Sequence, residues 1–205
     1  EFDARVGVSS FLFYDPSARV VATLNPNHSW EKVIFDPWRQ ESWDVNDTVL
    51  VTDPKADPDV GDFFRRLSEN EYQPTWHEQR QTAALGLEEQ ITAVKTEVHA
   101  ATPSIAHSDS LGRTFLTVAH NKFRRSDSDP VEEEFYSTRV VFDIEGNQRE
   151  VIDAGDRVVM RYDYNMLGQQ IHQTSTEAGE RWGCRILRGI PSTLGTVAST
   201  SFELP

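Results

Sequence analysis

The segment Ser108-Asp109-Ser110-Leu111-Gly112-Arg113 has an aspartate near its start, a glycine after two intervening residues, and an arginine directly after the glycine. An aspartate carboxylate can accept hydrogen bonds from the backbone N–H groups of a tight turn. Glycine adopts the positive φ that many hairpin turns require, and the arginine then begins the returning strand. The segment therefore predicts the turn of a β-hairpin.

The same order of residue types recurs along the chain, and two of the intervals between successive copies are about 20 residues. The helical segment and an acidic stretch lengthen the other intervals. The related segments are Tyr14-Asp15-Pro16-Ser17-Ala18-Arg19, Phe35-Asp36-Pro37-Trp38-Arg39, Phe142-Asp143-Ile144-Glu145-Gly146-Asn147 and Tyr164-Asn165-Met166-Leu167-Gly168-Gln169.

A single hairpin cannot bury its own face, so repeated hairpins predict a sheet of units stacked side by side, whose interior can remain hollow when the sheet coils. Three departures from the repeat are visible, and one is that the expected next hairpin does not appear after Arg181-Trp182. Ala18 replaces the glycine, which implies either a type I turn with no positive φ or some backbone strain. Gln169 and Gln170 stand where the repeat often carries a basic residue.

Residues 59–101 differ from the rest and predict an α-helical insertion. Asp59 and Asp62 precede an apolar run, as acids do in a first helical turn. Thr75 and Glu78 form a capping-box pattern, and Gly86 suits the left-handed position that ends a helix.

A third helix follows and is predicted to end near Pro103. Its apolar residues recur at helical spacing, which is typical of a stripe that packs into a core. The stripe consists of Leu87, Ile91, Val94 and Val98. Strand patterns return from Ser104 to Thr174, and the acidic stretch from Ser126 to Glu134 is interpreted as a solvated loop.

The chain is therefore divided into hairpins at 1–58, a helical insertion at 59–103, further hairpins at 104–182 and a divergent, non-repeat tail at 183–205. With 33 acidic and 20 basic residues, the net charge of -13 argues against nucleic acid and anionic membrane surfaces as partners. No stretch approaches the length of a membrane span. The single cysteine, Cys184, excludes an internal disulfide and a thiolate metal cluster.

The sequence predicts no catalytic, cofactor-binding or metal-binding residue. The histidines lack metalloprotease spacing and are interpreted as surface or turn residues; they are His28, His77, His99, His107, His120 and His172. Four acids could supply calcium ligands but do not match an EF-hand, and capping and turn formation explain them better; they are Asp53, Asp57, Asp59 and Asp62. Ser9, Ser10 and Ser192 lack a nucleophile elbow.

The tryptophans allow two interpretations. Their flat rings could form a carbohydrate platform, but aromatic cross-strand pairs are the more common use in sheets. They are Trp30, Trp38, Trp43, Trp76 and Trp182.

Several longer sequence motifs resemble the Rhs/YD-repeat family, and most closely the YD-repeat part of the B component of bacterial insecticidal toxin complexes. The resemblance covers roughly residues 8–182. These motifs are Asp44-Val45-Asn46-Asp47-Thr48, Asp59-Val60-Gly61-Asp62-Phe63-Phe64, Thr117-Val118-Ala119-His120-Asn121, Asp143-Ile144-Glu145-Gly146-Asn147-Gln148-Arg149 and Met160-Arg161-Tyr162-Asp163-Tyr164.

The resemblance implies part of a hollow β-shell that encapsulates a cytotoxic effector in a secreted bacterial toxin complex, with no enzymatic activity and no cofactor. It implies three partners: neighbouring YD-repeat segments of the same protein, a C component with its encapsulated effector, and an A component that forms the translocation pore. The alternative is an adhesion or recognition module that binds glycan or protein at a cell surface.

Overall fold

The structure is a computed structural model that describes residues 9–126 and 129–183. The chain divides into two compact units, Glu1–Ser137 and Thr138–Pro205. Cys184, Ser192 and the predicted tail beyond Gly183 lie outside the described residues. The four-part division drawn from the sequence stays a prediction.

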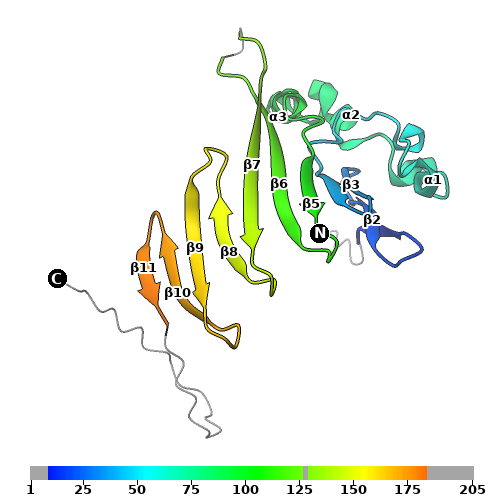
Figure 1. The fold of residues 1–205 in the computed structure, drawn as a ribbon. Helices are drawn as coiled ribbons and strands as arrows, with labels where there is room; N and C mark the ends of the chain where they lie inside the picture. Colours follow the sequence, from blue (N-terminus) through cyan, green and yellow to red (C-terminus); the bar gives the residue numbers. More distant parts are fainter. Residues whose placement is uncertain (1–8, 127–128, 184–205) are drawn as a thin grey trace, which may run out of the picture. The chain divides into compact units, whose positions relative to one another are not determined.

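The described residues form eleven β-strands, and within each unit hydrogen-bonded strands are also neighbours in the sequence (Figure 1). All recorded strand pairs are antiparallel, which confirms a mainly β chain of hairpins. The strands are β1 (Phe11–Tyr14), β2 (Val20–Leu24), β3 (Trp30–Phe35), β4 (Arg39–Trp43), β5 (Ser104–Ser108), β6 (Thr114–Phe123), β7 (Glu132–Phe142), β8 (Gln148–Ile152), β9 (Val158–Tyr164), β10 (Gln170–Ser175) and β11 (Gly179–Trp182).

The turn predicted at Asp109 has the expected hydrogen bonds. The Asp109 N–H donates to the Arg113 carbonyl at 3.0 Å, and the Gly112 N–H donates to the Asp109 carbonyl at 2.9 Å. The Asp109 carboxylate accepts the N–H groups of Leu111 and Arg113, at 2.9 and 3.0 Å. Gly112 has the positive φ of 75° that this five-residue turn requires.

The same turn occurs at Asp15, Asp143 and Asn165, as the repeat predicts, and also at Asp153, which the repeat did not identify. Asp36 differs, because its N–H donates to the carbonyl of Arg39 and closes a shorter turn. From β1 to β10 a turn therefore follows each strand except β4, which the insertion follows, and β6, which a longer loop follows; elsewhere successive turns are about ten to twelve residues apart. Because paired strands are antiparallel, the interval of about 20 residues joins turns at the same end of the strands.

Positive φ also occurs where the repeat has no glycine. Ala18 has a φ of 62° and Asp156 a φ of 57°. Of the two interpretations of Ala18, the structure shows backbone strain, because a Cβ atom is disfavoured in this region.

The helices lie between β4 and β5, as predicted for the insertion. They are the α-helices α1 (Gly61–Phe64), α2 (Trp76–Gln81) and α3 (Leu87–Glu97), with 3-10 turns at Pro54–Ala56, Glu69–Glu71 and Ala83–Leu85. The capping box is confirmed, because Thr75 and Glu78 bond reciprocally at the start of α2. Gly86 has a φ of 109° but caps the start of α3, so its predicted place at the end of the preceding helix is wrong.

The predicted role of the α3 stripe is wrong. Leu87, Ile91 and Val94 are 63%, 38% and 57% exposed, whereas Ala93 is buried. The small Ala93 side chain permits close packing of this helix against the rest of the insertion, and α3 packs mainly against α2. Leu87, Ile91 and Val94 consequently face outward, whereas Val98, the fourth residue of the stripe, is half-buried.

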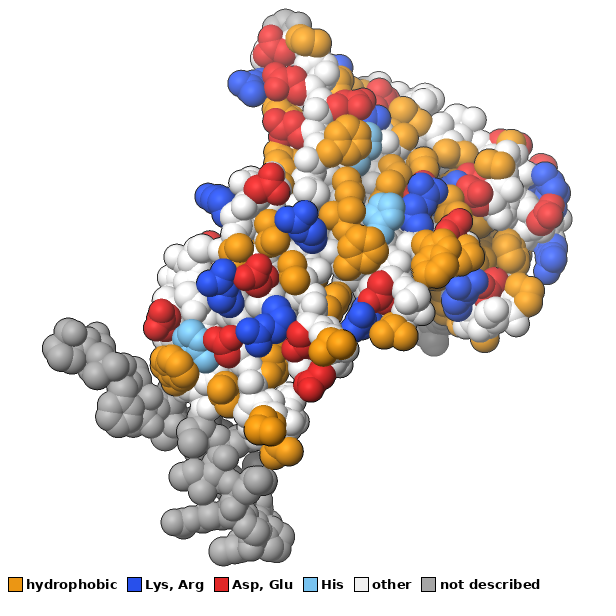
Figure 2. Space-filling view, in the orientation of Figure 1, with side chains coloured by type: hydrophobic (Ala, Val, Ile, Leu, Met, Phe, Trp, Pro, Cys, Tyr) orange, Lys and Arg blue, Asp and Glu red, His pale blue; other side chains and the backbone are white. Residues whose placement is uncertain are grey.

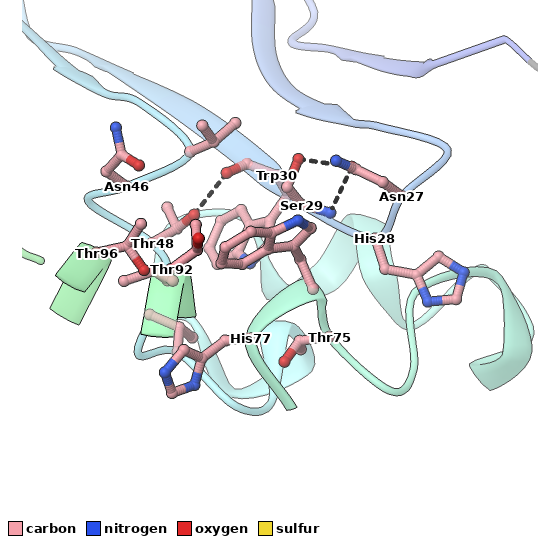
Figure 3. Close-up of a pocket in the computed structure, with 14 residues that line it drawn as sticks. Asn27, His28, Ser29, Trp30, Asn46, Thr48, Thr75, His77, Thr92 and Thr96 are labelled. Carbon is pink, nitrogen blue, oxygen red and sulfur yellow. Dashed lines mark hydrogen bonds between the residues drawn. The ribbon is translucent and has the colours of Figure 1, made fainter. Parts of the chain in front are cut away.

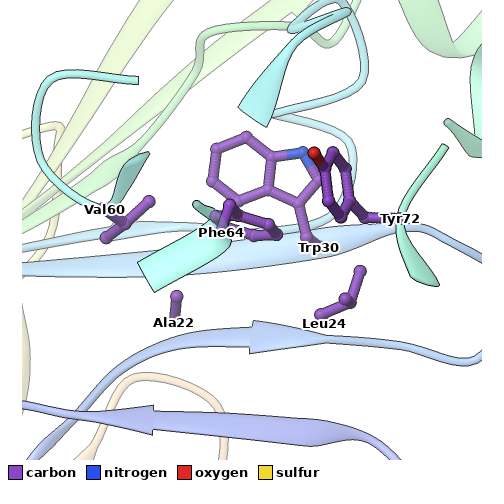
Figure 4. Close-up of a cluster of buried hydrophobic side chains, with 6 residues drawn as sticks. All are labelled: Ala22, Leu24, Trp30, Val60, Phe64 and Tyr72. Atoms are coloured by element: carbon purple, nitrogen blue, oxygen red, sulfur yellow. The ribbon is translucent and has the colours of Figure 1, made fainter. Parts of the chain in front are cut away.

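A core forms where the insertion covers one face of β2 and β3 (Figure 4). Ala22 and Leu24 alternate inward on β2, and Trp30 faces the same core from β3. Phe64 of α1 is fully buried, with its ring 5.3 Å from Trp30 and 5.7 Å from Tyr72. The insertion is therefore part of the core of the first unit.

The acidic loop predicted at 126–134 is shorter than expected, because β7 already begins at Glu132. Opposite charges on β6 and the segment that follows it explain the difference. Arg125 pairs with Glu132 at 3.1 Å, and Lys122 lies 3.6 Å from Glu133. These cross-strand pairs let acidic residues extend the strand.

We predict that Ala18→Gly raises the free energy of unfolding by about 0.5–1 kcal/mol, because glycine removes the Cβ strain at positive φ. Gly112→Ala, at the equivalent turn position, should lower it by about 1 kcal/mol. Urea unfolding of both variants measures the two changes. Equal effects of the same sign would contradict this account of the turn.

Candidate functional site

A buried lysine joins the insertion to the sheet. Lys32 lies on β3, and its Nζ is 2.7 Å from a carboxylate oxygen of Asp57 and 2.7 Å from one of Asp59. The side chains of Lys32 and Asp57 are each 5% exposed, and that of Asp59 is 36% exposed. Desolvation lowers the Lys32 pKa, but hydrogen bonds with both carboxylates outweigh it and raise that pKa above the ordinary value. The ammonium is therefore charged in the folded chain.

This cluster accounts for two of the four acids considered as calcium ligands. Asp57 also accepts the N–H groups of Asp59 and Val60, while Asp53 caps the 3-10 turn at Pro54. Asp62 pairs with Arg65. Over residues 9–126 and 129–183, no three His, Cys, Asp or Glu side chains gather closely enough to hold a metal ion.

Sequence reasoning missed Lys32, although a signal was present. Trp30, Lys32 and Ile34 alternate along one strand, so they point to the same face. Because Trp30 faces the core, a lysine at the next inward position requires an acidic partner.

A cavity of about 230 Å³ lies between the insertion and the turn that joins β2 to β3 (Figure 3). Trp30 and Thr48 line it beside α2, which contributes Trp76 and His77. Its lining contains no Asp, Glu, Lys or Arg side chain among the residues that the structure describes. The cavity is therefore lined by hydrogen-bonding groups, indole rings and the aliphatic side chains of Val45, Val49 and Val51.

The histidines occupy different surroundings. His28 and His99 lie in turns, as predicted. His77 is 3% exposed, so its predicted place at the surface or in a turn is wrong. Its Nε2 lies 3.0 Å from a carboxylate oxygen of Glu97, and its Nδ1 lies 3.3 Å from the side-chain nitrogen of Gln81. These contacts hold the buried ring between α2 and α3.

The remaining histidines lie on strands, where aromatic rings contact them. His107 lies 6.5 Å from the ring of Phe115, and His120 stacks on Phe135 with ring centres 4.3 Å apart. His172 stacks on Trp182 at 4.0 Å and bonds the Asp163 carboxylate at 2.9 Å. The His172 hydrogen bond is the main cause that lowers the pKa of Asp163.

The tryptophans serve both sheet pairing and the insertion. Trp30, Trp43 and Trp182 pair across strands with Leu24, Lys32 and His172, in agreement with the cross-strand interpretation. Two tryptophans depart from it: Trp38 is 57% exposed at a turn, and Trp76 lies under the Arg80 guanidinium at 4.4 Å.

Of the three serines considered as nucleophiles, the structure describes Ser9 and Ser10. Ser9 and Ser10 are exposed, and the Ser10 hydroxyl donates to the side-chain oxygen of Asn25 at 3.0 Å.

Acidic and basic side chains are interspersed over the strands of the second unit (Figure 2). Arg161 pairs with Glu150 at 2.9 Å, and Arg149 pairs with Asp163 at 2.9 Å. Both ion pairs join neighbouring strands, so these charged side chains stabilise the pairing of the strands.

Charge also stabilises the turns. The Arg113 side chain lowers the pKa of Asp109, and the Arg157 side chain lowers that of Asp153, in each case through a hydrogen bond to the carboxylate. In the described part of the chain, no helix is long and apolar enough to cross a membrane.

No protein-family model and no curated protein sequence matches the chain. Solved structures do. A Photorhabdus luminescens Tc holotoxin pore matches 83% of this chain at 16% identity with a TM-score of 0.55, and this chain covers 6% of that one. The TcdB2–TccC3 complex matches 83% at 18% identity, with a TM-score of 0.54 and 6% of that chain covered.

A third structure, TcdB2–TccC3 without its hypervariable C-terminal region, matches 87% of this chain at 16% identity, with a TM-score of 0.55 and 7% of that chain covered. This chain has the fold of a segment of these Tc toxin structures. The chain spans less than a tenth of the length of each of these Tc toxin chains.

We predict that Lys32→Met lowers the free energy of unfolding by about 3 kcal/mol or more, because it leaves the buried Asp57 carboxylate unpaired. Adding Asp57→Asn should restore part of the loss. The measurement is urea unfolding followed by tryptophan fluorescence.

The matched control is Lys55→Met, at an ion pair with Glu69 whose side chains are 30% and 75% exposed. Its loss should be much smaller. A loss as large at Lys55 as at Lys32 would show that burial of the ion pair is not the cause.

We predict that acid weakens the fold through the turn aspartates. A carboxyl pKa that is lowered in the folded state stabilises above the unfolded value, and that stability is lost as pH falls. The free energy of unfolding should therefore decrease as pH falls below the ordinary value of 3.8.

The double variant Asp109→Asn, Asp153→Asn tests this, because asparagine serves the same turn at Asn165 and cannot titrate. Its urea midpoint should depend less on pH in this range than that of the unmodified chain. Identical pH profiles of the two chains would exclude the turn carboxylates as the source of the pH dependence.

Proposed function

We propose that this chain is a segment of the β-shell wall that encapsulates the cytotoxic effector of a secreted insecticidal toxin complex. The observation that carries the proposal is the shared fold with Tc toxin structures over 83–87% of the chain. A structural role agrees with a chain built from turn-closed hairpins in which each strand pairs with its sequence neighbour.

The strand order supports continuation into further repeats. Among the described residues the outer strands are β1 and β11, and an outer strand presents backbone groups that another strand can pair with. In the proposal, neighbouring YD-repeat segments of the same protein continue the wall. The small share of each Tc toxin chain that this chain covers agrees with such a modular wall.

The exposed stripe of α3 supports a further contact. Leu87, Ile91 and Val94 form an apolar helix face that the insertion leaves uncovered. In a larger shell this face would bury itself against a neighbouring segment. That burial would stabilise the assembly through the hydrophobic effect.

In this proposal the chain has no catalytic role. Its further partners are the C component, which carries the encapsulated effector, and the A component, which forms the translocation pore. The complex acts outside the bacterium that secretes it.

Protection of the effector from protease tests the proposal. The whole protein that contains this chain is coexpressed with its C component, and the effector tail is followed by immunoblot during proteinase K digestion. An enclosing wall should keep the tail intact. Phe64→Ala should expose the tail, because losing a buried aromatic side chain costs about 3–5 kcal/mol.

Leu111→Ala is the control, since Leu111 is 74% exposed at a turn. It should leave the tail protected. A tail that is digested at the same rate in the unmodified complex and in isolation would refute encapsulation.

A further inference from the structure

We propose that the cavity between the insertion and the β2–β3 turn binds a neutral, hydroxyl-rich ligand of monosaccharide size. This goes beyond a role in the wall. The inference rests on the hydrogen-bonding state of the lining residues, the indole rings among them and the size of the cavity.

Three threonine hydroxyls that line the cavity already donate their protons to backbone carbonyl groups. Thr48 donates to the Trp30 carbonyl at 2.5 Å. On α3, Thr92 donates to the Glu88 carbonyl at 2.8 Å, and Thr96 donates to the Ala93 carbonyl at 2.7 Å. Each hydroxyl oxygen can therefore only accept from a ligand. A ligand that donates several hydrogen bonds fits this arrangement.

The cavity also offers a donor. The Asn27 side-chain oxygen accepts from both the N–H and the hydroxyl of Ser29, which points its amide nitrogen away from these contacts. That nitrogen has two N–H groups to offer. A ligand hydroxyl both donates and accepts, so it can use Asn27 and the threonines together.

The Trp76 ring favours a ligand with an apolar C–H face. Trp30 and Trp76 both line the cavity, but Trp30 is only 2% exposed, so the ring available for stacking is that of Trp76. Arg80 covers one face of the Trp76 ring at 4.4 Å, so in the proposal a ligand stacks on the opposite face. A pyranose ring combines C–H faces with hydroxyls at its edge, and it stacks on flat aromatic rings.

The charge of the lining residues and the volume of the cavity restrict the class of ligand that fits. Among the described residues that line the cavity there is no Asp, Glu, Lys or Arg side chain, so a permanently charged ligand would find no permanently charged partner there. The volume of about 230 Å³ is below that of typical drug-sized pockets, which suits a single sugar ring.

Nuclear magnetic resonance of the full 205-residue chain tests the site, with free glucose, galactose, mannose and N-acetylglucosamine as the probes. At least one sugar should shift the indole N–H signals of Trp30 and Trp76, with a dissociation constant on the order of 1 mM. The signals of Trp38 and Trp182, which do not line the cavity, should not move.

Thr96→Val removes one acceptor with little change of shape and should weaken binding by about three- to tenfold. Thr117→Val, on the exposed surface of β6, is the matched control and should bind as the unmodified chain does. Dispersed indole signals in both variants show that they remain folded.

The proposal is overturned if no sugar shifts the two cavity indoles at concentrations well above the expected constant. Equal shifts at Trp38 and Trp182 would also overturn it, since they indicate nonspecific stacking on exposed rings. Unchanged affinity in Thr96→Val would place the ligand elsewhere.

Discussion

The hydrogen bonds of an Asp or Asn side chain within a five-residue turn are the interaction on which the rest of the structure depends. At Asp15, Asp109 and Asp153, one carboxylate oxygen accepts two backbone N–H groups and the other pairs with the arginine that directly precedes the next strand. The turn thereby sets where each strand ends and where the next begins. Strand register follows from turn geometry, so a one-residue change would reverse the faces.

Regular turns make a sheet, but they do not make a core. Hairpins of this kind leave both faces open, and the first unit solves this with the helical insertion. Phe64 and Tyr72 cover Trp30, while Lys32 ties the insertion to β3 through Asp57. The insertion therefore adds a second layer to a sheet that would otherwise be a single layer.

The same insertion contributes two features of the first unit: the outward-facing stripe of α3 and the cavity beside Trp30. Its α3 helix buries Ala93 and turns a stripe of larger aliphatic residues outward, and its polar side chains enclose the cavity beside Trp30. The strands and the insertion thus have separate physical roles. The turn-closed strands provide a continuous surface that can be extended, and the helices provide shape-specific contacts that a repeated hairpin cannot offer.

Sequence patterns predicted most of the hairpin turns, the capping box at Thr75 and the β-rich class, because the hydrogen bonds of these turns and of the cap join residues within a few positions of one another. Three-dimensional packing sets which side of α3 is buried, brings Lys32 to Asp57, and places threonines from distant segments around one cavity with Trp30. Those contacts depend on how the chain packs between β4 and β5, and local patterns do not encode that packing.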